Sequence, residues 1–77
     1  MKQTSLIQLK ANRRGRVSEV LGGANLQNRL MNMGVYKGRE VIKLSHIGLK
    51  GPVVIKVGRG ILALGHNIAT KVIVEAV

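Results

Sequence analysis

Five side chains of this sequence could coordinate a metal ion, and none of them is a cysteine or an aspartate. They are two histidines and three glutamates, namely His46, His66, Glu19, Glu40 and Glu75. Iron(II) or zinc is usually held by several imidazole, thiolate or carboxylate groups, and no two of these residues stand at a local ligand spacing. We therefore predict no specific metal site and no cofactor. The two histidines are expected to be solvated, and they become candidate ligands for weak or transient iron(II) or zinc binding only if the fold brings them together.

Residues for catalysis are equally few. A serine nucleophile needs a histidine base and an orienting acid, and the sequence has no nucleophile elbow to present one. The glycine-rich stretches Gly22-Gly23 and Gly58-Arg59-Gly60 lack the lysine and hydroxyl residue of a phosphate-binding P-loop, so we interpret them as turns. A chain of 77 residues forms one domain with little room for a buried cleft. We predict a single domain over residues 1–77 that is not an enzyme.

Positive charge is the strongest chemical signal in the composition. The chain has 13 Lys or Arg residues against 3 acidic ones, for a formal net charge of +10. Such a surface attracts phosphates or acidic proteins. Arg13 and Arg14 precede the first predicted strand, while Lys37 and Arg39 follow the predicted helix. We expect these four residues to bind a partner if the two loops share one end of the fold.

Nucleic acid is one partner that this positive charge could attract. Proteins that bind single strands stack bases on several aromatic rings, and Tyr36 is the only aromatic residue of the Phe, Trp and Tyr class here. A contact with RNA phosphates alone needs no such rings, and residues 15–23 are slightly similar to the KOW element of ribosomal SH3-like barrels. An RNA-binding barrel is therefore the alternative function, beside the interpretation that the charge only aids solubility.

The elements that must position these side chains are short. Leu26, Leu30 and Met33 recur at spacings of four and three, which predicts one helix that begins at Asn25 and ends at Met33. Gly34 follows in the position of a left-handed helix cap. Five runs with strand periodicity are divided by glycine, and they cover residues 16–21, 39–45, 53–57, 61–64 and 72–75. The first of these runs alternates poorly, which indicates a bulge or a strong twist.

Five short strands, one inserted helix and no long connection predict a mainly β fold, a small SH3-like five-stranded barrel, with an OB-like barrel as the alternative. In the second strand, Ile42 and Leu44 are expected on one face and Lys43 and Ser45 on the other. No stretch has the length of a membrane span and the N-terminus does not resemble a signal peptide, so we expect a soluble, cytoplasmic protein.

Several apolar residues are assigned to the interior by their spacing alone. Leu30 and Met33 should fill the barrel from the helix, and Ala63 should fit a tight interior position. The N-terminal segment should close one end of the barrel with three more apolar residues, Leu6, Ile7 and Leu9.

Four segments then follow one another in an order that carries a resemblance. The most informative reads Arg29-Leu30-Met31-Asn32-Met33-Gly34-Val35, followed by Gly38 and Val41. Around it lie a strand and turn over residues 15–23, a Gly-Pro strand over residues 51–57, and an apolar ending over residues 61–74. This arrangement resembles the FeoA family, the ferrous-iron transport protein A family, whose motif reads Arg-Leu-x-x-Met-Gly-(Ile/Val/Leu)-x-x-Gly-x-x-(Val/Ile).

The resemblance implies both a fold and a function. It implies an SH3-like barrel that is related to the C-terminal domains of metal-dependent repressors. It also implies an accessory role in ferrous iron uptake, with a FeoB-type membrane transporter or its cytoplasmic GTP-binding domain as the partner. On this hypothesis the protein docks on the transporter, is held at the membrane through it, and alters transport or GTP turnover.

Overall fold

The computed structural model describes residues 2–77, and its centre is one sheet of six antiparallel strands in the order β1-β6-β2-β3-β4-β5. The strands are β1 (Gln3–Ser5), β2 (Arg14–Val20), β3 (Glu40–His46), β4 (Val53–Val57), β5 (Gly60–Leu64) and β6 (Val72–Ala76). Two short helices interrupt them, α1 (Ala24–Asn32) and α2 (His66–Thr70). The mainly β prediction is confirmed. Neither helix in the described part of the chain is long and apolar enough to cross a membrane.

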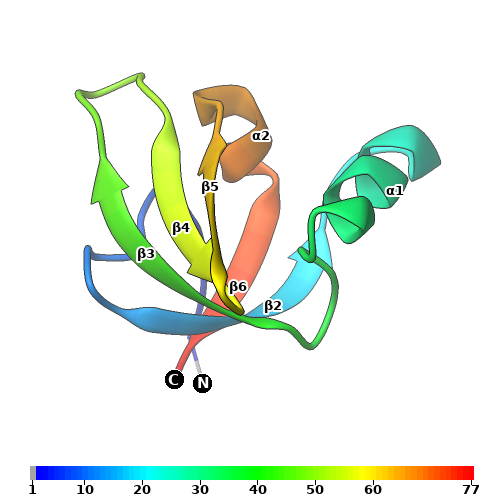
Figure 1. The fold of residues 1–77 in the computed structure, drawn as a ribbon, viewed down its shortest axis with the longest axis horizontal. Helices are drawn as coiled ribbons and strands as arrows, with labels where there is room; N and C mark the ends of the chain where they lie inside the picture. Colours follow the sequence, from blue (N-terminus) through cyan, green and yellow to red (C-terminus); the bar gives the residue numbers. More distant parts are fainter. Residues whose placement is uncertain (1) are drawn as a thin grey trace.

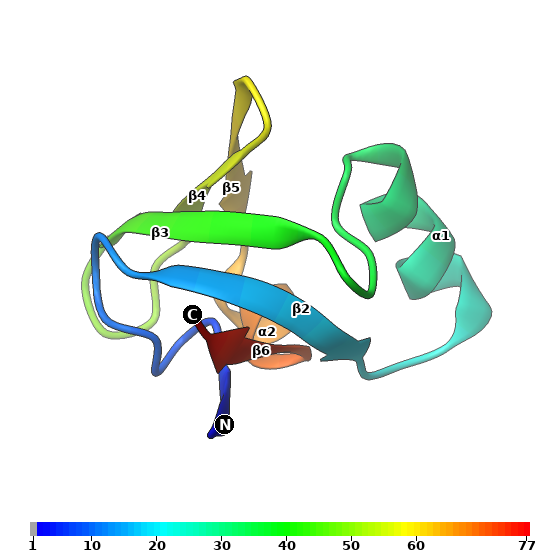
Figure 2. The ribbon, with the colours of Figure 1, turned by 90° about the horizontal axis from the view of Figure 1, so that it is seen from below.

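The sheet curls strongly on itself. In Figure 1 the hairpin of β3 and β4 rises over β2 and β6, and in Figure 2 β4 and β5 run across the direction of β2 and β3. The pairing register shifts in β2 between Val17 and Glu19, and in β3 between Lys43 and Ser45. Such bulges increase strand twist and help a small sheet to close around a core. The bulge predicted for the first long strand is thus confirmed.

The core fills the inside of this curl with side chains from every part of the chain. Leu6 and Leu9 are buried and Ile7 packs against them, which confirms the predicted role of the N-terminal segment. Leu30 is the only fully buried side chain of α1. The buried apolar residues are Leu6, Leu9, Val17, Leu30, Val35, Val41, Val53, Ile55, Val57, Leu64, Ala69, Val72 and Val74.

Some elements differ from the predicted ones. The structure adds β1, which pairs with β6, and α2, which covers only five residues. Both are too short for a periodic pattern to reveal them. Helix α1 begins at Ala24 and ends at Asn32, so it starts one residue before the predicted helix, and its N-cap is Gly23 with no capping side chain.

Three predicted side-chain orientations are wrong. Ala63 faces outward and is exposed, and Met33 is 39% exposed rather than part of the core. In β3 the order of faces is reversed, because Val41 and Lys43 are buried while Ile42 is only half-buried. Alternation of residue types could not reveal this reversal, because it assigns the interior to apolar residues and Lys43 is a charged residue.

Gly34 ends α1 with φ of +91°, as predicted for a left-handed cap. Its amide donates to the Met31 carbonyl, and a β carbon at this position would lie 3.2 Å from Cγ1 of Val57. We expect Gly34→Val to lower the free energy of unfolding by about 1 to 2 kcal/mol or more, because a β-branched residue is strained at positive φ. Urea denaturation measures this loss, and an unchanged midpoint would reject the cap assignment.

Candidate functional site

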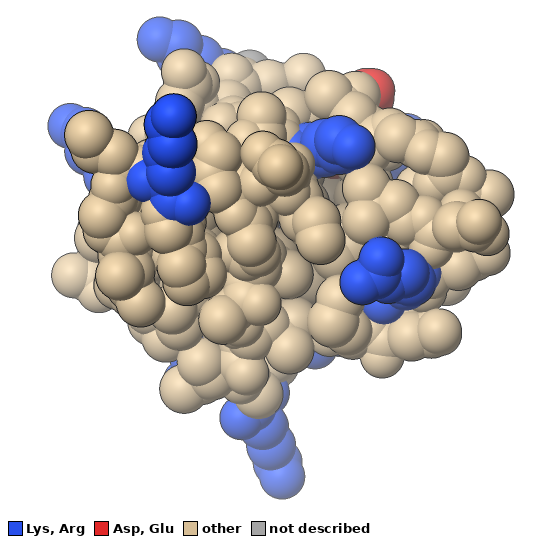
Figure 3. Space-filling view, turned by 90° about the horizontal axis from the view of Figure 1, so that it is seen from above, with Lys and Arg blue, Asp and Glu red and all other residues tan. Residues whose placement is uncertain are grey.

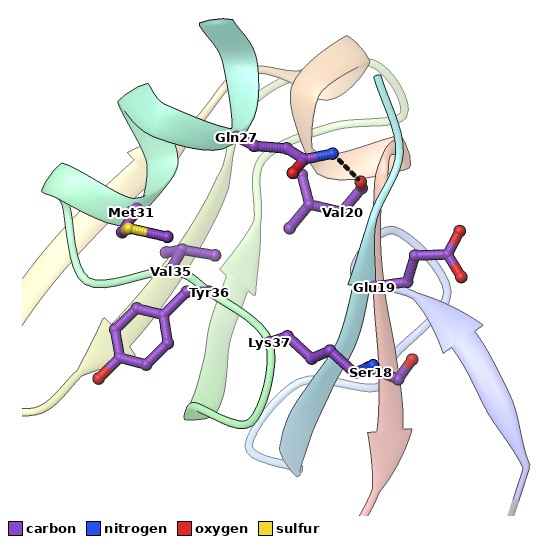
Figure 4. Close-up of a pocket in the computed structure, with 8 residues that line it drawn as sticks. All are labelled: Ser18, Glu19, Val20, Gln27, Met31, Val35, Tyr36 and Lys37. Carbon is purple, nitrogen blue, oxygen red and sulfur yellow. Dashed lines mark hydrogen bonds between the residues drawn. The ribbon is translucent and has the colours of Figure 1, made fainter. Parts of the chain in front are cut away.

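A groove separates α1 from β2 (Figure 4). We call it the α1–β2 groove, and its volume is about 380 Å³. Its lining comes from β2, from the inner side of α1 and from the chain that follows α1. The lining residues are Ser18, Glu19, Val20, Gln27, Met31, Val35, Tyr36 and Lys37.

One side chain ties the two walls of this groove together. Gln27 on α1 points across to β2, where its Nε2 donates to the Val20 carbonyl at 3.3 Å and to the Gly22 carbonyl at 3.3 Å. The helix has nine residues, too few to be stable alone in water, so its position depends on this bridge and on the buried Leu30. The width of the groove is therefore set by contacts within this chain.

The strand wall of the groove has an incompletely paired side. Strand β2 pairs with β3 over Arg14, Gly15 and Arg16, and the Val17 amide still donates to the Arg39 carbonyl. Beyond that point Glu19 and Val20 pair with β6 only. The groove runs along the other side of this segment, which is the type of strand edge that can accept an extended peptide.

Apolar surface flanks this edge. Met31 is 56% exposed and Tyr36 is 37% exposed, while Val35 forms the buried floor between them. A methionine thioether adapts to different partner shapes, and tyrosine contributes a large rigid surface, so both types are common where proteins bind one another. Glu19 and Lys37 add one charge of each sign. The groove is thus suited to a protein segment of mixed polarity.

The four basic residues predicted to bind a partner do not gather at one end. The Lys43 amide donates to the Arg13 carbonyl, whereas the Arg39 carbonyl accepts from the Val17 amide. Arg13 and Arg14 therefore lie at one end of the β2–β3 pair and Arg39 and Lys37 lie beyond the other. The expectation of a shared end is wrong, because the two strands run antiparallel and separate these loops by their length.

The surroundings of the four residues also differ. Arg14 lies 3.8 Å from the Glu40 carboxylate, which also accepts a hydrogen bond from Arg16 at 3.3 Å. Arg39 donates to the Tyr36 hydroxyl at 3.1 Å and is half-buried. Arg13 and Lys37 are exposed, and within residues 2–77 neither side chain has an ion pair or hydrogen bond. Of the four, these two are the most available to a partner.

Positive charge is spread over the molecule rather than concentrated. On the face drawn in Figure 3 the Lys and Arg side chains are separated from one another by uncharged surface, with one acidic side chain among them. The outer face of the sheet adds a mixed row across four strands, in which Arg14, Ile42, Lys56 and Ile61 are successive cross-strand neighbours. A dispersed charge of this kind favours long-range attraction over a single phosphate site.

The structure brings the two predicted candidate metal ligands together. The rings of His46 and His66 lie with their centroids 5.9 Å apart, and both residues are half-buried, so the expectation of two solvated histidines is wrong. No group of three or more His, Cys, Asp or Glu side chains that could hold a metal ion occurs among the described residues. The three glutamates therefore do not complete a conventional site with the histidines.

Sequence reasoning missed one buried charge. Lys43 is 3% exposed, and its Nζ donates to the Ile7 carbonyl at 2.8 Å, which ties β3 to the N-terminal segment. Burial disfavours the charged ammonium and lowers the pKa of Lys43 from its usual 10.5. A lysine in an alternating strand gives no sequence signal that it points inward, because lysine is rarely buried.

This burial predicts a pH dependence of stability. The unfolded chain binds more protons than the folded protein between the lowered pKa of Lys43 and 10.5, so this residue makes the free energy of unfolding rise with pH across that range. We expect wild type to gain stability relative to Lys43→Met as pH rises through that range. Urea denaturation at several pH values measures the difference, with Lys56→Met as the exposed control. Parallel profiles for wild type and Lys43→Met would contradict the expectation.

Comparison with known proteins places this geometry in a family. A family model described as the FeoA domain matches residues 4–76. The chain belongs to the FeoA family. A search among curated proteins returns no match. Membership implies a role in ferrous iron transport and confirms the resemblance on which that expectation rested.

Solved structures agree with this assignment. A crystal structure of an iron uptake regulatory protein, FeoA, is 28% identical, with each chain covered over 100% and a TM-score of 0.89. FeoA of Stenotrophomonas maltophilia, solved with zinc, is 28% identical with a TM-score of 0.79, and the match covers 94% of this chain and 89% of that one. That protein is described as a prokaryotic SH3-domain protein and suggested to be a ferrous iron transport activating factor. The SH3-like prediction is thereby confirmed.

The same fold extends beyond the family. A manganese-dependent transcriptional repressor is 13% identical and superimposes with a TM-score of 0.87, over 97% of this chain and 42% of the repressor. At that identity the match concerns the fold alone. A part of that repressor therefore has the same fold as this chain.

Proposed function

We propose that this chain is a cytoplasmic accessory protein of ferrous iron transport that docks on the cytoplasmic part of a FeoB-type transporter. In this proposal it acts by binding, not by catalysis, and it changes the transport or GTP cycle of its partner. The observation that carries the proposal is the α1–β2 groove, a partly apolar groove beside a half-paired strand, on the scaffold of the FeoA family. In residues 2–77 no group of three or more metal-ligating side chains occurs, so the proposal assigns the protein a binding role rather than that of an iron carrier.

Docking would use two kinds of contact. An extended segment of the transporter would lie along β2 beside Glu19 and Val20, in the manner of a strand added to a sheet edge, and it would displace the Gln27 amide from the Val20 carbonyl. Met31 and Tyr36 would cover its apolar side chains, since these two residues flank the groove and are exposed. Main-chain hydrogen bonds would then supply affinity, and the apolar contacts would supply specificity.

Charge would act mainly on the rate of association. The net charge of +10 attracts an acidic cytoplasmic surface or the anionic membrane beside it. Lys37 lies at the groove, and its charge is not neutralised by a partner in the described chain. Because the Debye length is about 8 Å at physiological salt, capture should weaken as salt rises, chiefly through the on-rate.

Capture of the transporter from solubilised membranes tests the proposal. We expect the immobilised protein to retain the FeoB-type transporter, less of it at high salt, and Lys37→Glu to retain less than wild type. Arg59→Glu is the matched control, because Arg59 is an exposed cation in the turn between β4 and β5, outside the groove. The GTPase rate of the recovered transporter, with and without the protein, then measures the effect on its cycle. Retention of RNA without retention of the transporter would favour the RNA-binding alternative.

A further inference from the structure

Two histidines from distant parts of the chain meet beside α2. His46 is the last residue of β3 and His66 is the first residue of α2. Strand β4 lies between them, since Val53 pairs with His46 on one side and with Leu64 on the other. The chain then turns after Leu64, and the two imidazole rings come to lie 5.9 Å apart with an angle of 28° between their planes.

The bulge in β3 produces this meeting. Lys43 is buried, and His46 pairs with the buried Val53, so both face the interior although they are three positions apart in the strand. A regular strand would turn one of the two outward. The register shift between Lys43 and Ser45 adds one residue to β3, and this extra residue turns the His46 side chain to the same face as Lys43. Without it His46 would point away from His66.

Each ring has one buried nitrogen that lacks a partner. Nε2 of His46 and Nδ1 of His66 are both buried, and neither has a hydrogen bond, not even with the other. Buried polar atoms are almost always satisfied in proteins, because an unsatisfied one costs its full desolvation free energy. One further group that contacts both rings would satisfy these two atoms together. The lone pair of an imidazole nitrogen accepts either a proton donor or a metal ion.

We propose that His46 and His66 form a two-histidine site for a divalent transition-metal ion of the class that prefers imidazole nitrogen, with Zn²⁺ as its simplest representative. This class favours imidazole, whereas Mg²⁺ and Ca²⁺ prefer oxygen ligands. The site is separate from the α1–β2 groove, and the proposal does not depend on docking.

The geometry of the pair agrees with coordination. With metal–nitrogen bonds of about 2.0 to 2.1 Å and a tetrahedral angle, two imidazole centroids would lie about 5 Å apart. The observed separation is 5.9 Å and the rings are stacked with 28° between their planes, so coordination would require both rings to turn their buried nitrogens towards one ion. A shallow opening beside His66 is lined also by Lys50, Gly65, Asn67 and Ile68. Water would occupy the remaining coordination positions.

Two features limit the affinity. The described part of the chain places two imidazole ligands here and no carboxylate with them, so the positive charge of the ion is not neutralised. Lys50 lines the same opening and adds repulsion. We therefore expect binding in the micromolar range, and we expect the fold to persist when a chelator removes metal, because the core is complete without it.

Titration of the purified protein with Zn²⁺ tests the site. Calorimetry should give one ion per chain, and NMR spectra of the histidine rings should show both His46 and His66 shifting together during the titration. A wild-type protein that binds no Zn²⁺ at millimolar concentration, or whose ring signals do not shift, would overturn the proposal. So would one ion per two chains, because the ligands would then come from two copies.

Substitutions of the two histidines and of Lys50 test the ligand assignment further. We expect His46→Gln and His66→Gln each to weaken Zn²⁺ binding by about tenfold or more. Lys50→Met should instead strengthen it, because the substitution removes a repelling charge and leaves both ligands in place. Unchanged affinity in either histidine variant, or weaker binding in Lys50→Met, would contradict the assignment. The NMR titration of wild type decides the question even if a variant fails to fold.

Discussion

Replacement of Leu30 by alanine is expected to destabilise the protein by about 2 to 5 kcal/mol, a large part of the stability of a small domain. Leu30 is 0% exposed and is the only fully buried side chain of α1. Its removal leaves a cavity and releases a nine-residue helix that cannot persist alone. Thermal denaturation should show a fall of about 10 °C or more in Tm, since about 1 kcal/mol shifts Tm by about 4 to 8 °C in a domain of this size.

The neighbouring residue provides a matched control. Met31 is 56% exposed on the same helix, so Met31→Ala removes a similar apolar volume without opening the core. We expect its free energy of unfolding to stay within about 0.5 kcal/mol of wild type. Faster amide exchange throughout α1 in Leu30→Ala, but not in Met31→Ala, would show that Leu30 attaches the helix. Equal stability of the two variants would refute that role.

Replacement of Gly51 by alanine should have the second large effect. The β3–β4 hairpin passes so close to this residue that a β carbon on Gly51 would overlap the carbonyl oxygen of Ile47. That carbonyl is backbone and cannot move aside alone, so the loop must be rebuilt, and the hydrogen bond from the Ile47 amide to the Pro52 carbonyl would be strained. We expect a loss of about 1 to 3 kcal/mol in the free energy of unfolding, as for other overpacked sites.

Gly60→Ala is the control for this change. A β carbon on Gly60 would make only an ordinary contact of 3.7 Å with the Val57 carbonyl oxygen. The alanine also restricts the unfolded chain, so stability should be unchanged or slightly higher. If urea denaturation gave equal midpoints for Gly51→Ala and wild type, the tight hairpin described here would be wrong.

The parts of the fold that the sequence predicts well are those with local causes. Helix α1 follows from the periodic Leu26 and Leu30, and its end follows from Gly34, whose positive φ few other residues adopt. The strand over Val53–Val57 was predicted with the bounds it has, because its apolar residues alternate cleanly. In each case the residues that define the element also stabilise it.

The parts that the sequence does not predict depend on register. A one-residue bulge in β3 turns Lys43 and His46 to the same side, and pattern analysis of separate strands cannot detect it. Strand β1 exists because β6 offers it an edge, not because residues 3–5 favour a strand. The meeting of His46 and His66 requires β4 to lie between their elements, which is a property of the whole sheet.

The candidate interface was likewise predicted from the sequence only in part. Composition predicts a basic surface, and the structure distributes it, with Arg14 and Arg39 engaged by Glu40 and Tyr36 respectively. Replacement of Arg39 by an acidic residue would therefore change packing as well as charge, since the guanidinium of Arg39 packs against Gly58. The α1–β2 groove was missed, because Met31 lies one residue beyond the apolar position Leu30 and does not follow the helix period that marks core residues.

Affinity for the purified FeoB-type transporter tests the docking proposal most directly. Calorimetric titration would compare wild type with Met31→Glu, which puts a charge at the exposed apolar wall of the groove, and with Asn28→Glu, which adds the same charge to α1 outside the groove lining. The account predicts that Met31→Glu raises Kd by about tenfold or more, a cost of about 1.4 kcal/mol, while Asn28→Glu changes it much less. Equal affinities of wild type and Met31→Glu, with both folded, would contradict it.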